Sequence, residues 1–390
     1  IQVCEHLPKS AKWMHRAAVI RSAFHLGVCH SNMPMYTGND SARDEEKRPS
    51  DPPSMGSVVD YYEQEVLRKK PGPISNYVYL PCPLGWGEVR VKGGPGSGFL
   101  GQRYEPLSTE CTAYVDKPQT SGQSDDMQRV RGEILFRGTE LAEGVTLDRL
   151  KNRRSLLSQL DDHMRNAETE PALQGHAKKQ QLAYDLMTSA AVREAFDLNR
   201  ESERLRERYG RSLFGDAALL GRRLVERGVR FVNVSWDNMR QRFSPPASNQ
   251  VWDTHERNFP ILKENHLPHL DQVYSALMED LHTRGLLDET LVVMMGEMGR
   301  TPRINANGGR DHWTFCYSVV MAGAGIRGGT AYGESDSIGA YVKDKPARIR
   351  DICATIYHCL GIDPEMPVYD QGGRPIPIAH GGQALKEVLA

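Results

Sequence analysis

In the second half of the chain, apolar residues follow two alternating periods. Apolar positions three and four residues apart, in runs that each stop at a glycine, are typical of helices. They predict helices over 213–227, 260–284 and 347–360. Short, mainly apolar runs between them predict strands over 229–234, 290–295 and 317–322. Apolar strands that alternate with helices are typical of a parallel sheet covered on both sides. We therefore expect an α/β fold with a mostly parallel sheet and helices on both of its faces.

The first half of the chain has a different pattern, in which clusters of Pro and Gly separate short apolar runs. The runs at 17–20 and 77–80 suit further buried strands of the same sheet. Between 143 and 212, charged residues surround a stripe of apolar residues at helical spacing. The stripe comprises Leu147, Leu150, Leu157, Leu160 and Met164. This pattern predicts a helical insertion over 143–212 within a single domain that spans 1–390.

Composition narrows the class of protein. Charged residues make up 25% of the chain and hydrophobic ones 39%, which is typical of a soluble globular protein. The formal net charge is -1, so no overall field favours nucleic acid as a partner. No window approaches the ~18 apolar residues of a membrane span. The seven cysteines form no CxxC pair, which excludes a zinc ribbon.

Polar residues suited to chemistry follow two of the predicted strands. Asp253 and His255 come after the strand at 229–234. Glu297 directly follows the next strand, and Asp311 and His312 lie further along the same segment. Because ligands of parallel α/β sheets bind at the carboxyl ends of strands, we expect these residues to gather there. Zinc and similar ions accept such a mixture of carboxylate and imidazole. The pattern predicts a metal site, and a cluster of this size suits two ions ~3.5 to 4 Å apart.

Arginines accompany these candidate ligands. Arg300 and Arg310 lie in the same segment, and a guanidinium binds phosphate or sulfate through paired hydrogen bonds. They are therefore candidates for binding an anionic substrate. Two plainer interpretations stay open. An Asp-His pair also serves as a cap or an ion pair, and an arginine beside a carboxylate is as often structural as catalytic.

At these residues the sequence resembles a known family. The matching stretches are 252–255 (WDTH), 296–305 (GEMGRTPRIN) and 309–313 (GRDHW). They look like the domain-of-unknown-function family 1501, which is grouped with alkaline phosphatases and sulfatases, and the resemblance covers nearly the whole chain. It implies an alkaline phosphatase-like fold that binds divalent ions (zinc, manganese or calcium), one or two of them. It also implies a small-molecule or glycan anionic ester as substrate and a periplasmic or secreted location.

The sequence departs from the family pattern in two places. Members usually begin with an export signal and a first strand that ends in a Gly-Gly-Pro-Ser-His-like turn and an Asp. We expect that this strand and its ligand either lie upstream of Ile1 or have been lost. Sulfatases also place a nucleophile shortly before a Leu-Thr-Gly element, whose counterpart here is 35–38. Ser31, or its neighbour His30, is the candidate there, although no Cys-x-Pro-Ser-Arg signature is present.

The resemblance favours a metal-dependent hydrolase of phosphate or sulfate esters. Two alternatives remain. One is a non-catalytic secreted binding protein that keeps the hydrolase fold, because a motif is missing and no nucleophile is obvious. The other is a phosphomutase-like transferase, which only the analogy of fold supports.

Overall fold

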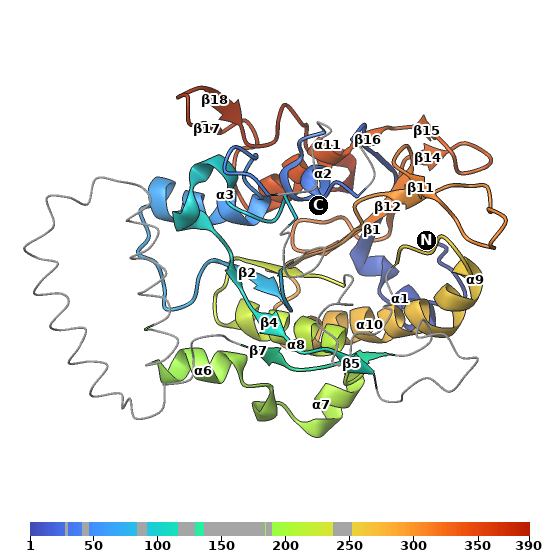
Figure 1. The fold of residues 1–390 in the computed structure, drawn as a ribbon, viewed down its shortest axis with the longest axis horizontal. Helices are drawn as coiled ribbons and strands as arrows, with labels where there is room; N and C mark the ends of the chain where they lie inside the picture. Colours follow the sequence, from blue (N-terminus) through green and yellow to red (C-terminus); the bar gives the residue numbers. More distant parts are fainter. Residues whose placement is uncertain are drawn as a thin grey trace, which may run out of the picture.

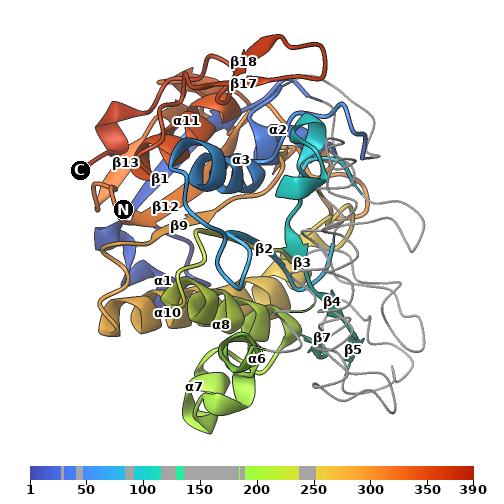
Figure 2. The same cartoon turned by 90° about the vertical axis from the view of Figure 1, so that its left-hand side faces the viewer.

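Two β-sheets form the centre of the molecule, which we describe from a computed structural model (Figures 1 and 2). The structure describes residues 1–27, 30–40, 47–83, 92–115, 129–135, 184, 189–236 and 252–390. The larger sheet contains five strands. In order these are β13 (Thr330–Tyr332), β1 (Ala17–Phe24), β12 (Tyr317–Gly323) and β9 (Leu291–Met294), with β16 (Ala347–Arg348) also paired to β1.

The larger sheet is mixed, so the prediction of a mostly parallel sheet is wrong for it. β1 runs parallel to β13 and β16 but antiparallel to β12, and β12 runs antiparallel to β9. The apolar sequence of these strands indicates that both of their faces are buried. Such burial is compatible with either strand direction, so the sequence did not distinguish parallel from antiparallel pairing. Parallel pairing would require a crossover between β9 and β12, and none is present there.

The smaller sheet has the parallel pairing that the sequence predicted. Its order is β3 (Leu107–Ser108), β2 (Tyr77–Leu80) and β8 (Phe231–Val234), and β2 is parallel to both neighbours. Phe231 of β8 packs against the same hydrophobic core as Leu291 and Val293 of β9. The two sheets therefore share a core.

Helices cover both faces of the larger sheet (Figure 2). Ala18 and Ile20 of β1 face a core that includes α11 (Ile349–Cys359) and α3 (Met55–Tyr61). The alternate residues Ala17 and Val19 face α10 (Leu267–Thr283). This alternation is the two-residue period of a strand that is buried on both sides. On the smaller sheet, α8 (Leu213–Glu226) packs against β2 and β8.

Short elements complete the described part of the chain. The remaining helices are α1 (Pro8–Ala11), α2 (Met33–Thr37), α6 (Ala190–Phe196), α7 (Glu203–Arg208) and α9 (Asn258–Ile261). The two-stranded pairs are β4 (Glu110–Cys111) with β7 (Ile134–Leu135), β5 (Tyr114–Val115) with β6 (Val130–Arg131), β10 (Gly299–Arg300) with β11 (His312–Trp313), β14 (Glu334–Ser335) with β15 (Val342–Asp344), and β17 (Pro367–Tyr369) with β18 (Pro375–Pro377).

The predicted helix over 260–284 is interrupted near its start. A π-helical turn over Leu262–His266 joins α9 to α10. Pro268 follows this turn, and its ring and missing N–H disfavour a regular helical bond at that place. Most of the predicted insertion over 143–212 lies outside the described residues. Its described end carries α6 and α7, and the division of the chain into a domain and an insertion stays a prediction. Among the described residues, no helix has the length and apolar character needed to cross a membrane.

Candidate metal centre

The candidate ligands lie on two segments that meet beside the larger sheet. β9 ends at the edge where the antiparallel β12 begins, because Met294 pairs with Val320. The chain between them therefore leaves and returns at one edge, and it carries Glu297, Arg300 and His312. The other segment follows β8 in the sequence and brings Asp253 and His255 to the same place.

The first segment is shaped by a short hairpin. Arg300 of β10 pairs directly with His312 of β11 in antiparallel register. Just beyond this pair, the backbone N–H of Thr301 donates to the carbonyl of Asp311, 2.8 Å away, and the Thr301 hydroxyl accepts from the N–H of Asp311. The hairpin thus fixes Arg300 and His312 side by side.

The two segments touch through their backbones. The N–H of Arg310 donates to the carbonyl of Thr254, and the Asn305 amide donates to the carbonyl of His255. At Gly309, any Cβ would overlap the carbonyl group of His255 and the nitrogen of Glu256. Only glycine fits there, and its presence lets the loop approach His255 closely.

Three potential ligand atoms converge where the segments meet. Nε2 of His255 and Nε2 of His312 lie 2.8 Å apart. Oδ1 of Asp253 lies 3.1 Å from His255 Nε2 and 2.8 Å from His312 Nε2. Ligand atoms of a tetrahedral zinc ion lie about 3.3 Å apart, given bonds of about 2.0 Å. The observed spacings are about 0.2 to 0.5 Å shorter than that value.

Asp311 takes a different position from the one expected of a ligand. Its Oδ1 lies 2.8 Å from Nδ1 of His255 and also accepts a hydrogen bond from the Asn305 amide. A carboxylate only accepts, so the hydrogen must be on Nδ1 of His255. The Nε2 lone pair of neutral His255 then points toward Asp253 and His312. Asp311 therefore orients His255, as carboxylates do behind metal-binding histidines.

His30 is a further member of the cluster that sequence reasoning did not single out as a ligand. Its Nε2 lies 3.5 Å from Oδ2 of Asp253, and its ring meets that of His312 edge-on at 4.2 Å between centroids. His30, Asp253 and His312 offer ligand atoms within 4.8 Å of one another. The backbone of His30 is in the left-handed region, with φ of 61°. A single sequence carries no signal of this placement beyond the position of His30 before Ser31.

Glu297 reaches the cluster through His30. Its Oε1 lies 3.9 Å from Nδ1 of His30. Its main-chain carbonyl lies 2.7 Å from Nε2 of His25, a fully buried residue just beyond β1. Burial lowers the pKa of His25, against the opposing effect of this hydrogen bond. Glu297 is thus anchored through its backbone while its carboxylate faces the cluster.

Electrostatics keep the carboxylates ionised. Burial raises the pKa of Asp253, but hydrogen bonds with His30, His312 and Arg300 outweigh it and hold this pKa well below its usual range. Hydrogen bonds with His255 and Asn305 lower the pKa of Asp311. Burial lowers the pKa of His312, although the bond with Asp253 opposes this effect. The cluster therefore presents ionised carboxylates beside a histidine that favours its neutral form, as cation binding requires.

Both candidate arginines are engaged by the protein itself. Arg300 donates to Oδ1 of Asp253 at 2.6 Å and to the main-chain carbonyls of Trp252 and Arg310. These three bonds leave two of its five N–H groups for another acceptor. Arg310 donates to the carbonyls of Thr301 and Pro302 through Nη1. Its guanidinium also lies over the ring of Phe259, 5.6 Å from the centroid.

Ser31 does not present its hydroxyl to solvent. Its side chain is 1% exposed, and its Oγ is buried without a hydrogen-bond partner. The structure therefore brings together the predicted metal residues, with His30 added and with Asp311 and Glu297 reached through histidines. It places Arg300 against Asp253, holds the Arg310 side chain on its own loop, and keeps Ser31 in the interior.

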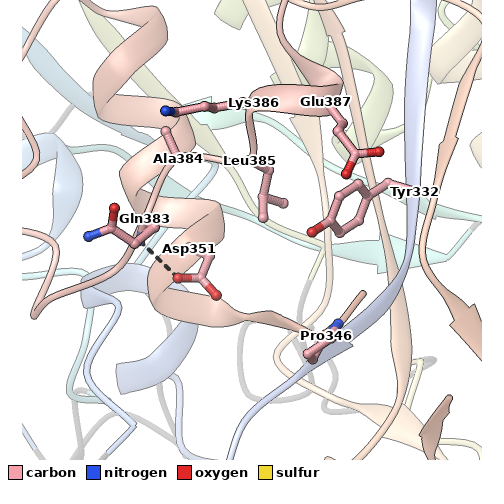
Figure 3. Close-up of a pocket in the computed structure, with 8 residues that line it drawn as sticks. All are labelled: Tyr332, Pro346, Asp351, Gln383, Ala384, Leu385, Lys386 and Glu387. Carbon is pink, nitrogen blue, oxygen red and sulfur yellow. Dashed lines mark hydrogen bonds between the residues drawn. The ribbon is translucent and has the colours of Figure 1, made fainter. Parts of the chain in front are cut away.

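A separate hollow of about 360 Å³ lies where α11 meets the C-terminal segment (Figure 3). Tyr332, Asp351, Gln383 and Glu387 are among its lining residues. Oδ1 of Asp351 accepts the N–H of Gln383, while Oδ2 accepts the N–H of Arg348 at the start of α11. The hollow shares no lining residue with the candidate centre.

Comparison with known proteins gives a family match over the whole chain. The model of a family described as "Protein of unknown function (DUF1501)" matches residues 1–389. No curated protein matches the sequence. Among solved structures, a phosphonate monoester hydrolase from Silicibacter pomeroyi is similar with 11% identity and a TM-score of 0.39; the match covers 98% of this chain and 71% of that one. The family match extends over both segments that carry the candidate ligands.

Proposed function

The chain belongs to the DUF1501 family of proteins of unknown function, and from its candidate centre we propose that it is a metal-dependent hydrolase of phosphate or sulfate esters. The observation that carries this proposal is the convergence of Nε2 of His255, Nε2 of His312 and Oδ1 of Asp253 within 2.8–3.1 Å. Without a shared cation, two imidazole nitrogens at this distance compete for one hydrogen. With a cation, all three lone pairs have a partner.

We propose that Asp253, His255 and His312 hold the ion, with Asp311 fixing the ring of His255. A donor set rich in imidazole suits zinc better than calcium, which prefers oxygen ligands. A bound divalent ion would polarise the ester and lower the pKa of a water molecule toward neutrality.

The carboxylate of Asp253 also supports a second ion. Its Oδ1 faces His255 and His312, whereas its Oδ2 faces His30, which in turn lies near Glu297. A carboxylate whose two oxygens face different ligand groups is suited to bridging two ions. His30 and Glu297 are therefore our proposed ligands for the second ion. Glu297 faces Nδ1 of His30 and Asp253 faces Nε2, so one of these side chains must turn for the three to share an ion.

The arginines support an anionic substrate. Arg300 lies against Asp253 and keeps two N–H groups that can donate to a phosphate or sulfate oxygen. Arg310 is fixed to the loop through Nη1, and its other N–H groups are the ones we propose for the anion. In this account Arg300 both holds Asp253 and orients the ester.

Ser31 fits the role of nucleophile poorly, because its hydroxyl is buried. We therefore favour direct attack by water over a serine intermediate. The same observation favours the second candidate function, a secreted binding protein that retains the cation and the anion site without turnover. A periplasmic or secreted location and a small-molecule or glycan ester as substrate remain proposals that rest on the family resemblance.

An ester panel tests the proposal. The full chain, loaded with zinc or manganese, is assayed with p-nitrophenyl phosphate, bis-p-nitrophenyl phosphate and p-nitrophenyl sulfate, beside chelator-treated protein. We expect turnover of at least one ester, its loss on chelation and in His312→Ala, and its return on adding metal to the unaltered chain. The matched control is His358→Ala, which removes an exposed histidine of α11. Metal binding with no turnover of any ester would favour the binding protein, and absence of metal binding would reject both.

A further inference from the structure

His25 joins the two sides of the candidate centre, although it contacts none of the three converging ligand atoms. It follows β1 directly and is fully buried, with 0% of its surface exposed. Its backbone N–H donates to the carbonyl of Thr314, 3.0 Å away, in the segment that leads into β12. Its ring packs edge-on against Tyr317 of β12 at 6.1 Å between centroids. The imidazole is thus held in one orientation between β1 and β12.

Both ring nitrogens of His25 are used, and their partners determine the tautomer. The N–H of Gly27 donates to Nδ1 at 3.1 Å. A backbone N–H only donates, so Nδ1 carries no hydrogen. The hydrogen is therefore on Nε2, which donates to the main-chain carbonyl of Glu297 at 2.7 Å. Neutral His25 satisfies both bonds at once, whereas an amide side chain of either length can make only one of them in the same place.

The two partners of His25 lead to two different candidate ligands. Gly27 lies three residues before His30, which approaches Asp253. Glu297 lies in the turn after β9, and its carboxylate faces the other ring nitrogen of His30. One buried imidazole therefore joins the backbone of Gly27 to the backbone of the Glu297 turn. A ligand carried on a turn is precise only if the turn is held, and no other described side chain donates to the Glu297 carbonyl.

We propose that His25 is a positioning residue for the metal centre, and that its Nε2–H bond to the Glu297 carbonyl keeps Glu297 in register with His30 and Asp253. The proposal rests on the proposed function, because it takes these residues as ligands. Partners that orient ligands from behind typically change metal affinity by about 10- to 100-fold when they are lost. A residue that only fills the core would instead change stability alone.

A pair of amide variants separates the two roles. His25→Gln has a side-chain amide that reaches the Nε2 position and keeps a donor for the Glu297 carbonyl. His25→Asn has an amide that reaches only the Nδ1 position, so it keeps the partner of Gly27 and loses the bond to Glu297. Both variants bury a side-chain amide at residue 25, and they differ in how far that amide reaches. Ile20→Ala, in the preceding strand β1 and equally buried, is the control for loss of stability without loss of a polar contact.

The measurements are the dissociation constant of zinc, by competition with a chromophoric chelator, and the thermal midpoint of the metal-free chain. We expect His25→Asn to bind zinc about 10- to 100-fold more weakly than the unaltered chain. His25→Gln should stay within a few-fold of the unaltered chain, and Ile20→Ala should lower the thermal midpoint with zinc affinity unchanged.

Equal zinc affinity in His25→Asn and His25→Gln, whether unchanged or equally weakened, would overturn the role of the Glu297 bond. That result leaves the proposed function standing, because the unaltered chain would still bind zinc. Failure of the unaltered chain itself to bind zinc would reject the metal centre and the role of His25 together.

Discussion

The imidazoles of His255 and His312 hold their Nε2 atoms 2.8 Å apart, beside Oδ1 of Asp253. Asp311 accepts a hydrogen bond from Nδ1 of His255, so Nε2 of neutral His255 carries a lone pair. Within the triangle only His312 can then supply a hydrogen, and Nε2 of His255 competes for it with Oδ1 of Asp253, which also accepts from Arg300. A divalent ion in place of that hydrogen would satisfy all three atoms, with neutral His312 carrying its hydrogen on Nδ1 instead.

Removal of the carboxylate behind His255 should weaken metal binding without removing a ligand. In Asp311→Ala, the ring of His255 is free to rotate and to move its hydrogen to Nε2, so zinc affinity should fall by about 10- to 100-fold. Competition with a chelator measures this change. The matched control is Glu256→Gln, which alters an exposed acid beside His255 and should leave the affinity unchanged. Equal affinities in Asp311→Ala and the unaltered chain would reject the orienting role.

Two adjacent glycines should differ sharply in what they tolerate. A Cβ at Gly309 would overlap the backbone of His255, so Gly309→Ala should force the segments apart and weaken zinc binding by on the order of 100-fold. Gly308 has open space around it but a φ of +69°. Gly308→Ala should therefore cost about 1 to 2 kcal/mol of stability and leave zinc affinity nearly unchanged. Zinc titration and urea unfolding of both variants check this contrast, which would be refuted if the two affinities fell equally.

Substitutions of the two arginines should have different effects, because their hydrogen bonds hold different parts of the site. Arg300→Ala removes the bond to Asp253 and two bonds to backbone carbonyls, so zinc affinity and stability should both fall. Arg310→Ala removes the bonds to Thr301 and Pro302 and the contact with Phe259, so it should cost about 1 to 2 kcal/mol of stability and keep zinc affinity. Inhibition by inorganic phosphate reports on the anion. We expect it to weaken in both variants, and an unchanged inhibition constant in either one would remove that arginine from the anion site.

Acid should destabilise the fold through His269, which is buried near the start of α10. Burial, with the nearby charges of Arg129 and His266, lowers the pKa of His269 to about 3, while Nε2 contacts the hydroxyl of Ser212. The unfolded chain takes up the proton near pH 6.5 and the folded chain does not, so this part of the stability is present above pH 6.5 and is lost as pH falls toward 3. Between pH 7.5 and 5.5 the loss should be about 1.4 kcal/mol.

Urea unfolding at the two pH values measures this loss. The unaltered chain is compared with His269→Gln, which keeps a partner for Ser212 and does not titrate. The difference between the two pH values should be about 1.4 kcal/mol larger in the unaltered chain than in the variant. If His269→Gln shows the same dependence on pH, other groups account for it.

The sequence predicts the elements well and their pairing only in part. Helical and strand periods place α8, α11, β8, β9 and β12 within about two residues of their bounds, because burial controls both period and composition. The direction of β12 was missed, because a strand buried on both faces has the same composition in either direction. The missing signal was the connection: no helix was predicted between β9 and β12, and parallel strands require a long crossover.

The candidate centre could be predicted where ligands follow strands, as with Asp253, His255 and His312. Roles within the cluster could not, because they depend on which ring nitrogen faces which oxygen. Asp311 directly precedes His312 in the sequence but pairs with His255. His25 was missed as part of the centre, and His30 was considered only as a candidate nucleophile and not as a ligand, since these segments meet only through tertiary packing between residues more than two hundred positions apart.

The metal content of the purified chain decides whether the candidate centre binds an ion. The full chain is incubated with zinc, dialysed against metal-free buffer and analysed by elemental mass spectrometry, beside the double variant His255→Ala/His312→Ala. The account predicts about one zinc ion or more per unaltered chain and almost none in the double variant. Absence of zinc from the unaltered chain, or equal zinc in both proteins, would contradict the account.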